Sequence, residues 1–208
     1  MTRGETRSSI AGPVGALEIA LNVPDSGTRG IALVAHPNPQ QGGTLDNKVA
    51  QTLARTFMAL GYASVRFNFR GVGASEGAFD NGNGETDDAL AALAFAQREF
   101  PALSALPPVL AGFSFGAYIQ TRVARMVAAE RMVLVGPAVK RFPVEGVATG
   151  TIVIHGEQDD VVPLADVFEW ARPQHLPIVV FPGCGHFFHG RLGQLQQTIV
   201  GMWRAQGA

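Results

Sequence analysis

The sequence predicts a doubly wound α/β fold, in which helices cover both faces of a mostly parallel β-sheet in three layers. Short apolar runs rich in Val, Ile and Phe alternate with longer segments of helical character. Several of these runs are continuously apolar, which is typical of strands covered on both faces. Strand–helix alternation of this kind implies right-handed crossover connections. Because the chain shows no internal repeat and no linker, we expect a single domain over residues 1–208.

Seven apolar runs are the predicted strands. The first run alternates polar and apolar residues and precedes every predicted helix, so we expect it to be an antiparallel edge strand. The remaining runs are the candidates for the parallel part of the sheet. In chain order, the predicted strands cover residues 16–23, 30–36, 63–69, 108–113, 131–136, 151–156 and 177–183.

Five longer segments are the predicted helices. The first has apolar residues at i, i+3 and i+4 and closes on Gly61, as a helix should. The second begins with Glu85, Asp87 and Asp88, and acidic side chains are favourable at the positive end of a helix dipole. The predicted helices cover residues 46–61, 85–100, 116–130, 163–172 and 191–206.

Composition and charge exclude several classes of protein. The chain is 47% hydrophobic and 16% charged, which is typical of a soluble globular protein. Its net charge is -1 and it has no basic run, so we expect neither a nucleic-acid nor a membrane partner. A single cysteine, Cys184, excludes an intrachain disulfide. With no apolar stretch suited to a secretory signal or a membrane span, we expect a cytoplasmic protein.

Reactive side chains follow the apolar runs. Ligands of parallel α/β sheets bind beyond the carboxyl ends of the strands. Loops are also the ordinary place for polar residues, so this position alone does not establish a site. The residues at or just after the end of a predicted strand include four of the five histidines, a serine and an aspartate: His36, Ser114, His155, Asp159, His186 and His189.

Residues 112–116 read Gly-Phe-Ser-Phe-Gly, with a predicted strand before them and a predicted helix after them. This matches the G-x-S-x-G motif, whose glycines leave room for a sharp turn that exposes the serine hydroxyl. The following helix directs N–H groups and partial positive charge at the place where an oxyanion would develop. A flexible glycine turn without a chemical role is the alternative, and the flanking strand and helix argue against it.

A serine hydroxyl is a weak nucleophile unless a base takes its proton. The loop after the next-to-last predicted strand contains Asp159 and Asp160, and the loop after the last one contains His186 and His189. The acid and the histidine therefore follow Ser114 in the order that this strand–turn–helix context requires.

Five motifs together resemble the α/β-hydrolase superfamily. More narrowly, they are similar to its small lidless bacterial members, which are related to dienelactone hydrolase and commonly described as predicted serine hydrolases. The resemblance extends from about residue 30 to residue 195 and implies a minimal α/β-hydrolase fold without a cap domain. The motifs are HPNP, RFNFRGVGASEG, GFSFG, HGEQDDVVP and GCGHFFHGRL.

The resemblance implies Ser114 as the nucleophile, Asp159 as the acid of H-G-x-x-D and His186 as the base. Its spacing favours Asp159 over Asp160, which we expect to be a solvated or turn-capping neighbour. His189 is expected to line the pocket or to cap a helix. The acid would hold the imidazole tautomer and stabilise the imidazolium without taking its proton.

The resemblance also implies two backbone N–H donors to the oxyanion, those of Phe115 and Asn38. Pro37 has no N–H and cannot serve. Members of the family often carry His at the position of Asn38. The backbone N–H is present with either residue, whereas a role of the His side chain would not carry over to Asn38.

An open site is expected, because residues 137–150 are too few to form a helical lid. We therefore predict a hydrolase of small to medium acyl esters that acts through an acyl-enzyme and needs no cofactor. A thioesterase or amidase would use the same residues. The candidate pocket residues are His36, Phe113, Phe187, Phe188 and His189.

Other interpretations are weaker. Cys184, His186 and His189 crowd into six residues without a second cluster, so we expect no metal. RGVGASEG follows a different strand from that of a dinucleotide loop, and in the resembling family it is an R-G-x-G-x-S loop, in which Arg70 would tie loops together and Ser75 would cap a turn. A non-catalytic protein that binds a small ligand or partner has no chemical need for serine, aspartate and histidine together. The sequence does not decide between a monomer and a homodimer.

Overall fold

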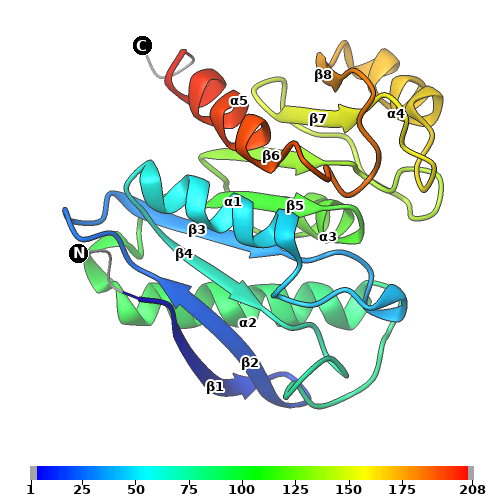
Figure 1. The fold of residues 1–208 in the computed structure, drawn as a ribbon. Helices are drawn as coiled ribbons and strands as arrows, with labels where there is room; N and C mark the ends of the chain where they lie inside the picture. Colours follow the sequence, from blue (N-terminus) through cyan, green and yellow to red (C-terminus); the bar gives the residue numbers. More distant parts are fainter. Residues whose placement is uncertain (1–3, 206–208) are drawn as a thin grey trace.

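The computed structural model describes residues 4–205, which form one eight-stranded sheet in the order β1-β2-β4-β3-β5-β6-β7-β8 (Figure 1). Strands β3 to β8 pair in parallel, whereas β1 and β2 pair antiparallel. The mostly parallel α/β fold predicted from the sequence is therefore confirmed. The strands are β1 Thr6–Gly12, β2 Gly15–Asn22, β3 Gly30–Ala35, β4 Tyr62–Phe67, β5 Val109–Phe113, β6 Arg131–Val135, β7 Ile152–Gly156 and β8 Ile178–Phe181.

Helices pack on both faces of the sheet. Alternate residues of each interior strand face opposite cores: in β3, Leu33 joins the core under α2 and α3, and Val34 joins the core under α1 and α5. This explains why interior strands such as β3 and β5 are apolar at every position. The α-helices are α1 Lys48–Ala59, α2 Asn83–Glu99, α3 Phe115–Val123, α4 Leu164–Ala171 and α5 Leu192–Ala205, and the 3-10 helices are η1 Pro39–Gln41, η2 Pro101–Leu103 and η3 Arg172–Gln174.

The strand expected at the edge of the sheet, residues 16–23, has a neighbour that the sequence did not reveal. Strand β1 pairs with β2 from Thr6 opposite Leu21 to Gly12 opposite Gly15, so β1 is the edge and β2 lies between it and β4. The sequence of β1, TRSSIAG, is largely exposed and nearly without apolar residues. The strand is therefore formed by backbone hydrogen bonds to β2 in a tight hairpin, and its side chains give no sign of it in the sequence.

The helix expected over residues 116–130 is shorter. It ends at Val123, after which Arg125 N–H donates to Arg122 O and Met126 N–H donates to Val123 O at 3.1 and 2.9 Å. These i→i−3 bonds tighten the last turn. The chain can then turn back toward β6.

The connection from β6 to β7 contains turns and no helix across residues 136–151. The predicted absence of a cap over the carboxyl edge of the sheet is therefore confirmed. No helix within residues 4–205 is long and apolar enough to cross a membrane.

Candidate active site

The turn at residues 112–116 joins β5 to α3 with no room for larger side chains. A Cβ on Gly112 would lie 2.4 Å from the Gly116 carbonyl oxygen, and a Cβ on Gly116 would lie 2.2 Å from Ala35 O. Ser114 between them has φ 56° and ψ −114°, a conformation that is costly for a residue with a Cβ. Its N–H donates to Val135 O at 2.9 Å, which ties the turn to β6.

Backbone donors lie next to Ser114. Helix α3 begins at Phe115, and among residues 4–205 the N–H groups of Phe115 and Gly116 have no acceptor, since the Ser114 side chain does not cap the helix. Within residues 4–205, neither Phe115 N–H nor Asn38 N–H donates to a protein acceptor. The positive end of the helix dipole adds to the attraction for negative charge at this point.

Asp159 and His186 come together from the loops after β7 and β8. His186 Nδ1 lies 2.6 Å from Asp159 Oδ2, and both side chains are almost completely buried. The other carboxylate oxygen, Oδ1, accepts the N–H groups of Val161 and Val162 at 2.9 and 2.7 Å. Burial acts to raise the pKa of Asp159, but hydrogen bonding and charge interaction with His186 outweigh it, so the pKa is lowered. Asp159 is therefore held as a carboxylate.

A second histidine contacts the same carboxylate. His155 is fully buried, its Nε2–H donates to Val162 O at 2.8 Å, and Nε2 lies 3.3 Å from Asp159 Oδ2. Burial, the largest influence, lowers the pKa of His155, so the ring is neutral. Within the described chain its Nδ1 has no hydrogen-bond partner. The i, i+4 spacing of His155 and Asp159 is the sequence feature that could have indicated this contact.

His36 is a buried link between two loops. Its Nδ1–H donates to Pro37 O at 2.7 Å, and its Nε2 accepts Phe69 N–H at 3.1 Å. Burial lowers the pKa of His36 to about 3. The expectation that His36 lines the pocket is not met, because both ring nitrogens are engaged inside the protein.

One pocket, with a volume of about 180 Å³, contains Ser114 and His186. One part of its wall is formed by Ser114, Val161, His186 and Phe187. The remainder comes from a single segment, residues 37–47, through Pro37, Asn38, Gln41, Gly42, Gly43 and Asn47.

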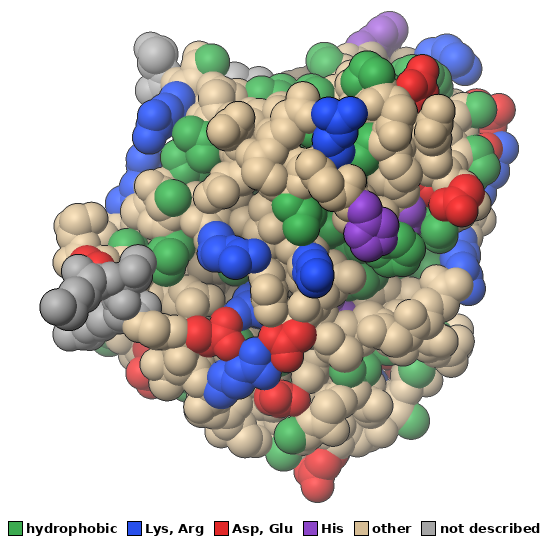
Figure 2. Space-filling model, viewed as in Figure 1, with side chains coloured by type: hydrophobic (Ala, Val, Ile, Leu, Met, Phe, Trp, Pro, Cys, Tyr) green, Lys and Arg blue, Asp and Glu red, His purple; other side chains and the backbone are tan. Residues whose placement is uncertain are grey.

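Among the aromatic residues expected to line the pocket, only Phe187 does so, and it is 44% exposed. Phe113 and Phe188 are fully buried in the core under α1 and α5, where the pleat of β5 and the turn after β8 direct them. Phe113 packs against the imidazole of His186, with the two ring centroids 4.8 Å apart. His189 is exposed and contacts Phe187, with ring centroids 5.8 Å apart, outside the pocket lining. In the space-filling view, histidines lie against hydrophobic side chains on the side toward which the parallel strands point (Figure 2).

Sequence reasoning missed the side chains of the segment 37–47. Asn38 caps η1 by accepting Gln40 N–H at 2.9 Å, and Asn47 caps α1 by accepting Val49 N–H at 2.9 Å. Polar residues before a helix start are recognisable as caps, but a cap position does not indicate that the residue also borders a pocket.

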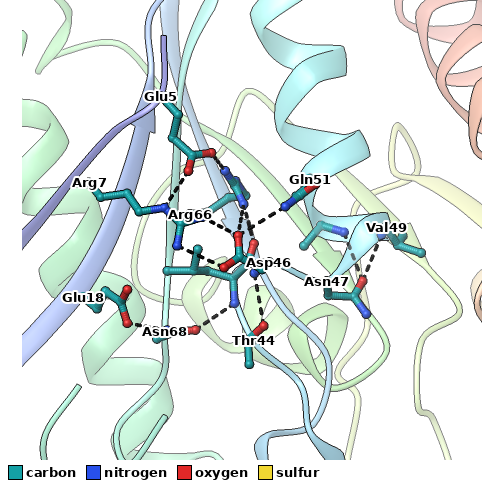
Figure 3. A network of polar contacts seen from close by, with 12 residues as sticks. Glu5, Arg7, Glu18, Thr44, Asp46, Asn47, Val49, Gln51, Arg66 and Asn68 are labelled. Carbon is teal, nitrogen blue, oxygen red and sulfur yellow. Dashed lines mark hydrogen bonds and ion pairs between the residues drawn. The ribbon is translucent and has the colours of Figure 1, made fainter. Parts of the chain in front are cut away.

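A network of polar contacts fixes the end of this segment (Figure 3). Asp46 accepts hydrogen bonds from Arg7 at 3.0 Å and from Gln51 at 3.2 Å, and the buried Arg66 donates to Leu45 O and to Glu5.

A further bond joins the same segment to the residues after β4. Asn68 Oδ1 accepts Leu45 N–H at 2.7 Å. These bonds connect β1, β4 and α1 to the wall of the pocket.

The RGVGASEG loop is bonded to a helix and a strand beside it. Arg70 pairs with the buried Asp88 of α2 through Nη2 and Nε at 2.9 and 3.0 Å. Ser75 Oγ donates to Asn68 O, just after β4, at 2.7 Å and accepts the N–H of Glu18 in β2 at 2.9 Å. These bonds anchor the loop to α2, to β2 and to the end of β4.

Cys184, His186 and His189 do not converge. Within residues 4–205, no group of three His, Cys, Asp or Glu side chains could hold a metal ion. Burial raises the pKa of Cys184, so its thiol is not activated.

The chain is similar to known proteins along nearly its whole length. A family model described as serine aminopeptidase, S33, matches residues 42–147. The solved structure of an α/β serine hydrolase homologue from Coxiella burnetii is 39% identical, covers 96% of this chain and 97% of that chain, and has a TM-score of 0.86. A Xanthomonas campestris protein described as an α/β serine hydrolase without a lid is 32% identical over 99% of this chain and 96% of that chain, with a TM-score of 0.87.

Dienelactone hydrolase from Anabaena variabilis is similar in fold. It covers 99% of this chain and 99% of its own length with a TM-score of 0.75. Its sequence is 19% identical.

Proposed function

The chain belongs to the lidless α/β serine hydrolases, and on that premise we propose that it hydrolyses small to medium acyl esters with Ser114, His186 and Asp159 as its catalytic residues. The observation that carries the proposal is the strained turn of Ser114 beside a histidine that is hydrogen-bonded to a buried carboxylate. A protein that only bound a ligand would have no chemical need for this combination.

Acylation begins with a proton transfer. The contact of His186 Nδ1 with Asp159 leaves Nε2 as the nitrogen that takes the proton from Ser114 Oγ. Oγ forms a bond to the ester carbonyl carbon, and the carbonyl oxygen becomes an oxyanion that accepts the N–H groups of Phe115 and Asn38. The tetrahedral intermediate then breaks its bond to the alcohol oxygen, which leaves with the proton from Nε2.

Deacylation repeats the same steps with water. Nε2 takes a proton from water, whose oxygen attacks the acyl carbon, and the bond between that carbon and Oγ breaks. Ser114 recovers its proton from His186, and the carboxylic acid is released. Asp159 stays ionised throughout, consistent with its lowered pKa, and stabilises the imidazolium.

The pocket favours esters over peptides with a free amino terminus. An aminopeptidase needs an acidic group to bind the substrate ammonium, and none of the described residues that line the pocket is acidic. The volume of about 180 Å³ is smaller than the roughly 300–1,000 Å³ of sites for drug-sized ligands, which supports small to medium acyl groups. We place this activity in the cytoplasm, since the single cysteine indicates a chain that does not depend on disulfides.

The test is the hydrolysis of p-nitrophenyl esters of rising acyl length by the wild type and by Ser114→Ala. We expect kcat/KM of the variant to fall by at least about ten-thousand-fold, because the nucleophile is removed. Ser104→Ala, at an exposed serine, is the matched control and should retain activity.

Labelling with a fluorophosphonate provides a second measurement. An adduct on Ser114 is expected, and it should be absent in Ser114→Ala. Absence of labelling of the wild type at every pH from about 6 to 9 would instead support a non-catalytic binding protein.

A further inference from the structure

The pocket has two chemically different walls. Ser114 follows β5, and in the sheet β3 lies on one side of β5 whereas β7 and β8 lie on the other. The wall after β3 carries three carboxamides, those of Asn38, Gln41 and Asn47. The opposite wall carries Val161 and Phe187, which are 39% and 44% exposed.

Helix capping determines which atoms of two carboxamides are left for a ligand. Asn47 Oδ1 accepts the N–H groups of Val49 and Ala50 at 2.9 and 3.3 Å, and Asn38 Oδ1 accepts Gln40 N–H at 2.9 Å. A backbone N–H can only donate, so each oxygen must face the helix, and each nitrogen keeps two hydrogens to donate.

Both amide nitrogens are accessible to a ligand. Among residues 4–205, neither has a hydrogen-bond partner and neither is among the buried polar atoms that lack one, and both residues line the pocket. Figure 3 shows Asn47 with its oxygen toward the start of α1 and its nitrogen turned away without a contact.

These donors are held in place before any substrate binds. Asp46, next to Asn47, is bonded to Arg7 and Gln51, and Leu45 N–H donates to Asn68 at 2.7 Å. Donors that are already ordered lose little entropy when they bind an acceptor.

The reaction assigns one wall to each half of an ester. His186 must give its proton to the departing alcohol oxygen, so the alcohol group lies beside His186 and its apolar neighbour Phe187. The acyl group then extends along the opposite wall.

We propose that the substrates are esters whose short acyl group carries an oxygen acceptor, such as a hydroxyl group, bound by the amide nitrogens of Asn47 and Asn38. This inference rests on the ester hydrolysis proposed above and names the acyl class. Asn47 is the better position to test, because the backbone of Asn38 is also a proposed oxyanion donor.

The experiment compares phenyl butanoate with its 2-hydroxy and 3-hydroxy derivatives, which share one leaving group. For each enzyme, the ratio of kcat/KM for a hydroxy ester to kcat/KM for the plain ester is measured. Dividing the ratio of a variant by that of the wild type cancels the intrinsic reactivity of the esters.

Two variants keep the cap of α1 but remove the donor. Serine and aspartate are good N-cap residues, so both Asn47→Ser and Asn47→Asp should fold. For at least one hydroxy ester we expect the ratio to fall about 3- to 10-fold in Asn47→Ser, the effect of one lost hydrogen bond, and further in Asn47→Asp, whose carboxylate repels an acceptor. Asn83→Ser, at an exposed asparagine of α2, is the control whose ratio should equal that of the wild type.

Two outcomes would overturn the inference, and they are distinguishable. If the wild type hydrolyses the esters and both Asn47 variants keep its ratios, the acyl assignment is wrong while the esterase activity stands. If the wild type hydrolyses none of the three esters, and phenyl esters of other short acids are not cleaved either, the proposed function fails together with the acyl assignment.

Discussion

Two of the segments that line the pocket are held in place in different ways. The serine turn, residues 112–116, is fixed by backbone atoms in close contact, with the sites of Cβ atoms on Gly112 and Gly116 already occupied. The segment 37–47 has one such contact, at Gly43, where a Cβ would lie 2.0 Å from Pro37 O. Its other fixation comes from side-chain hydrogen bonds, in which Asn38 and Asn47 cap helices and Asp46 binds Arg7.

The serine turn holds the residue proposed to react, whereas the segment 37–47 forms the wall proposed to bind the acyl group. Steric fixation is nearly all-or-none, because a single added methyl group cannot be accommodated by backbone atoms without moving the turn. A segment held by several hydrogen bonds can lose one of them and keep the others, because each bond contributes only about 1 kcal/mol to its stability. We therefore expect changes at the crowded glycines of the serine turn to abolish hydrolysis, and changes at the hydrogen-bonding side chains of the segment 37–47 to adjust it.

The largest effect is expected for Gly116→Ala. The new Cβ would lie 2.2 Å from Ala35 O, so the free energy of unfolding should fall by about 3 kcal/mol and ester hydrolysis should be lost. Urea denaturation and p-nitrophenyl ester hydrolysis measure the two effects. Gly201→Ala in α5 meets no atom within 4 Å and should be neutral or stabilising by up to about 1 kcal/mol. If Gly116→Ala had the stability and activity of the wild type, close backbone contacts would not be what holds the serine turn in place.

A smaller effect is expected from pH through His36. Its folded-state pKa of about 3 lies below the ordinary histidine value of 6.5, so the unfolded chain binds a proton over a pH range in which the folded protein does not. Stability is therefore complete above pH 6.5 and falls as the pH drops toward 3. Between pH 7.5 and 5 this should cost about 2 kcal/mol, measured as the extra loss of unfolding free energy in the wild type relative to His36→Gln. Parallel pH curves for the two proteins would contradict this expectation.

The smallest effect is expected for Asp46→Ala. The Asp46 carboxylate is about half exposed, so losing its contacts with Arg7 and Gln51 should lower the free energy of unfolding by only about 0.5–1 kcal/mol. The effect should shrink in about 1 M NaCl, where the Debye length is near 3 Å. Urea denaturation at low and high salt measures it. If this variant lost hydrolysis completely, the hydrogen bonds of the segment 37–47 would not contribute separately to its position, contrary to our expectation.

The interior of the fold could be predicted because its physical cause is present in each segment. Strands such as β3 and β5 are buried on both faces, so their sequences are apolar at every position. Strand β1 could not be predicted, since its stability comes from pairing with β2 and its side chains are mostly exposed. The early end of α3 at Val123 likewise follows from where the chain must turn toward β6.

The polar residues of the site followed from topology, whereas its walls did not. In a parallel sheet the ends of β5, β7 and β8 lie at one edge, so topology groups Ser114 with the acids and histidines of two later loops. The choice of Asp159 over Asp160 and of His186 over His189 came from the family resemblance. Which face an aromatic side chain takes depends on the exact pleat and turn, and so Phe113 and Phe188 were wrongly expected in the pocket.

The order of the strands also bears on how the chain is assembled during synthesis. Residues up to 67 contain β1 to β4, which are neighbours in the sheet, and β5 to β8 then join at one free edge in the order in which they are made. At roughly 5–20 residues per second on the ribosome, Ser114 emerges seconds before His186. The nascent protein therefore carries Ser114 before His186 has been made, and the hydrolysis that we propose can begin only when the last strand has docked.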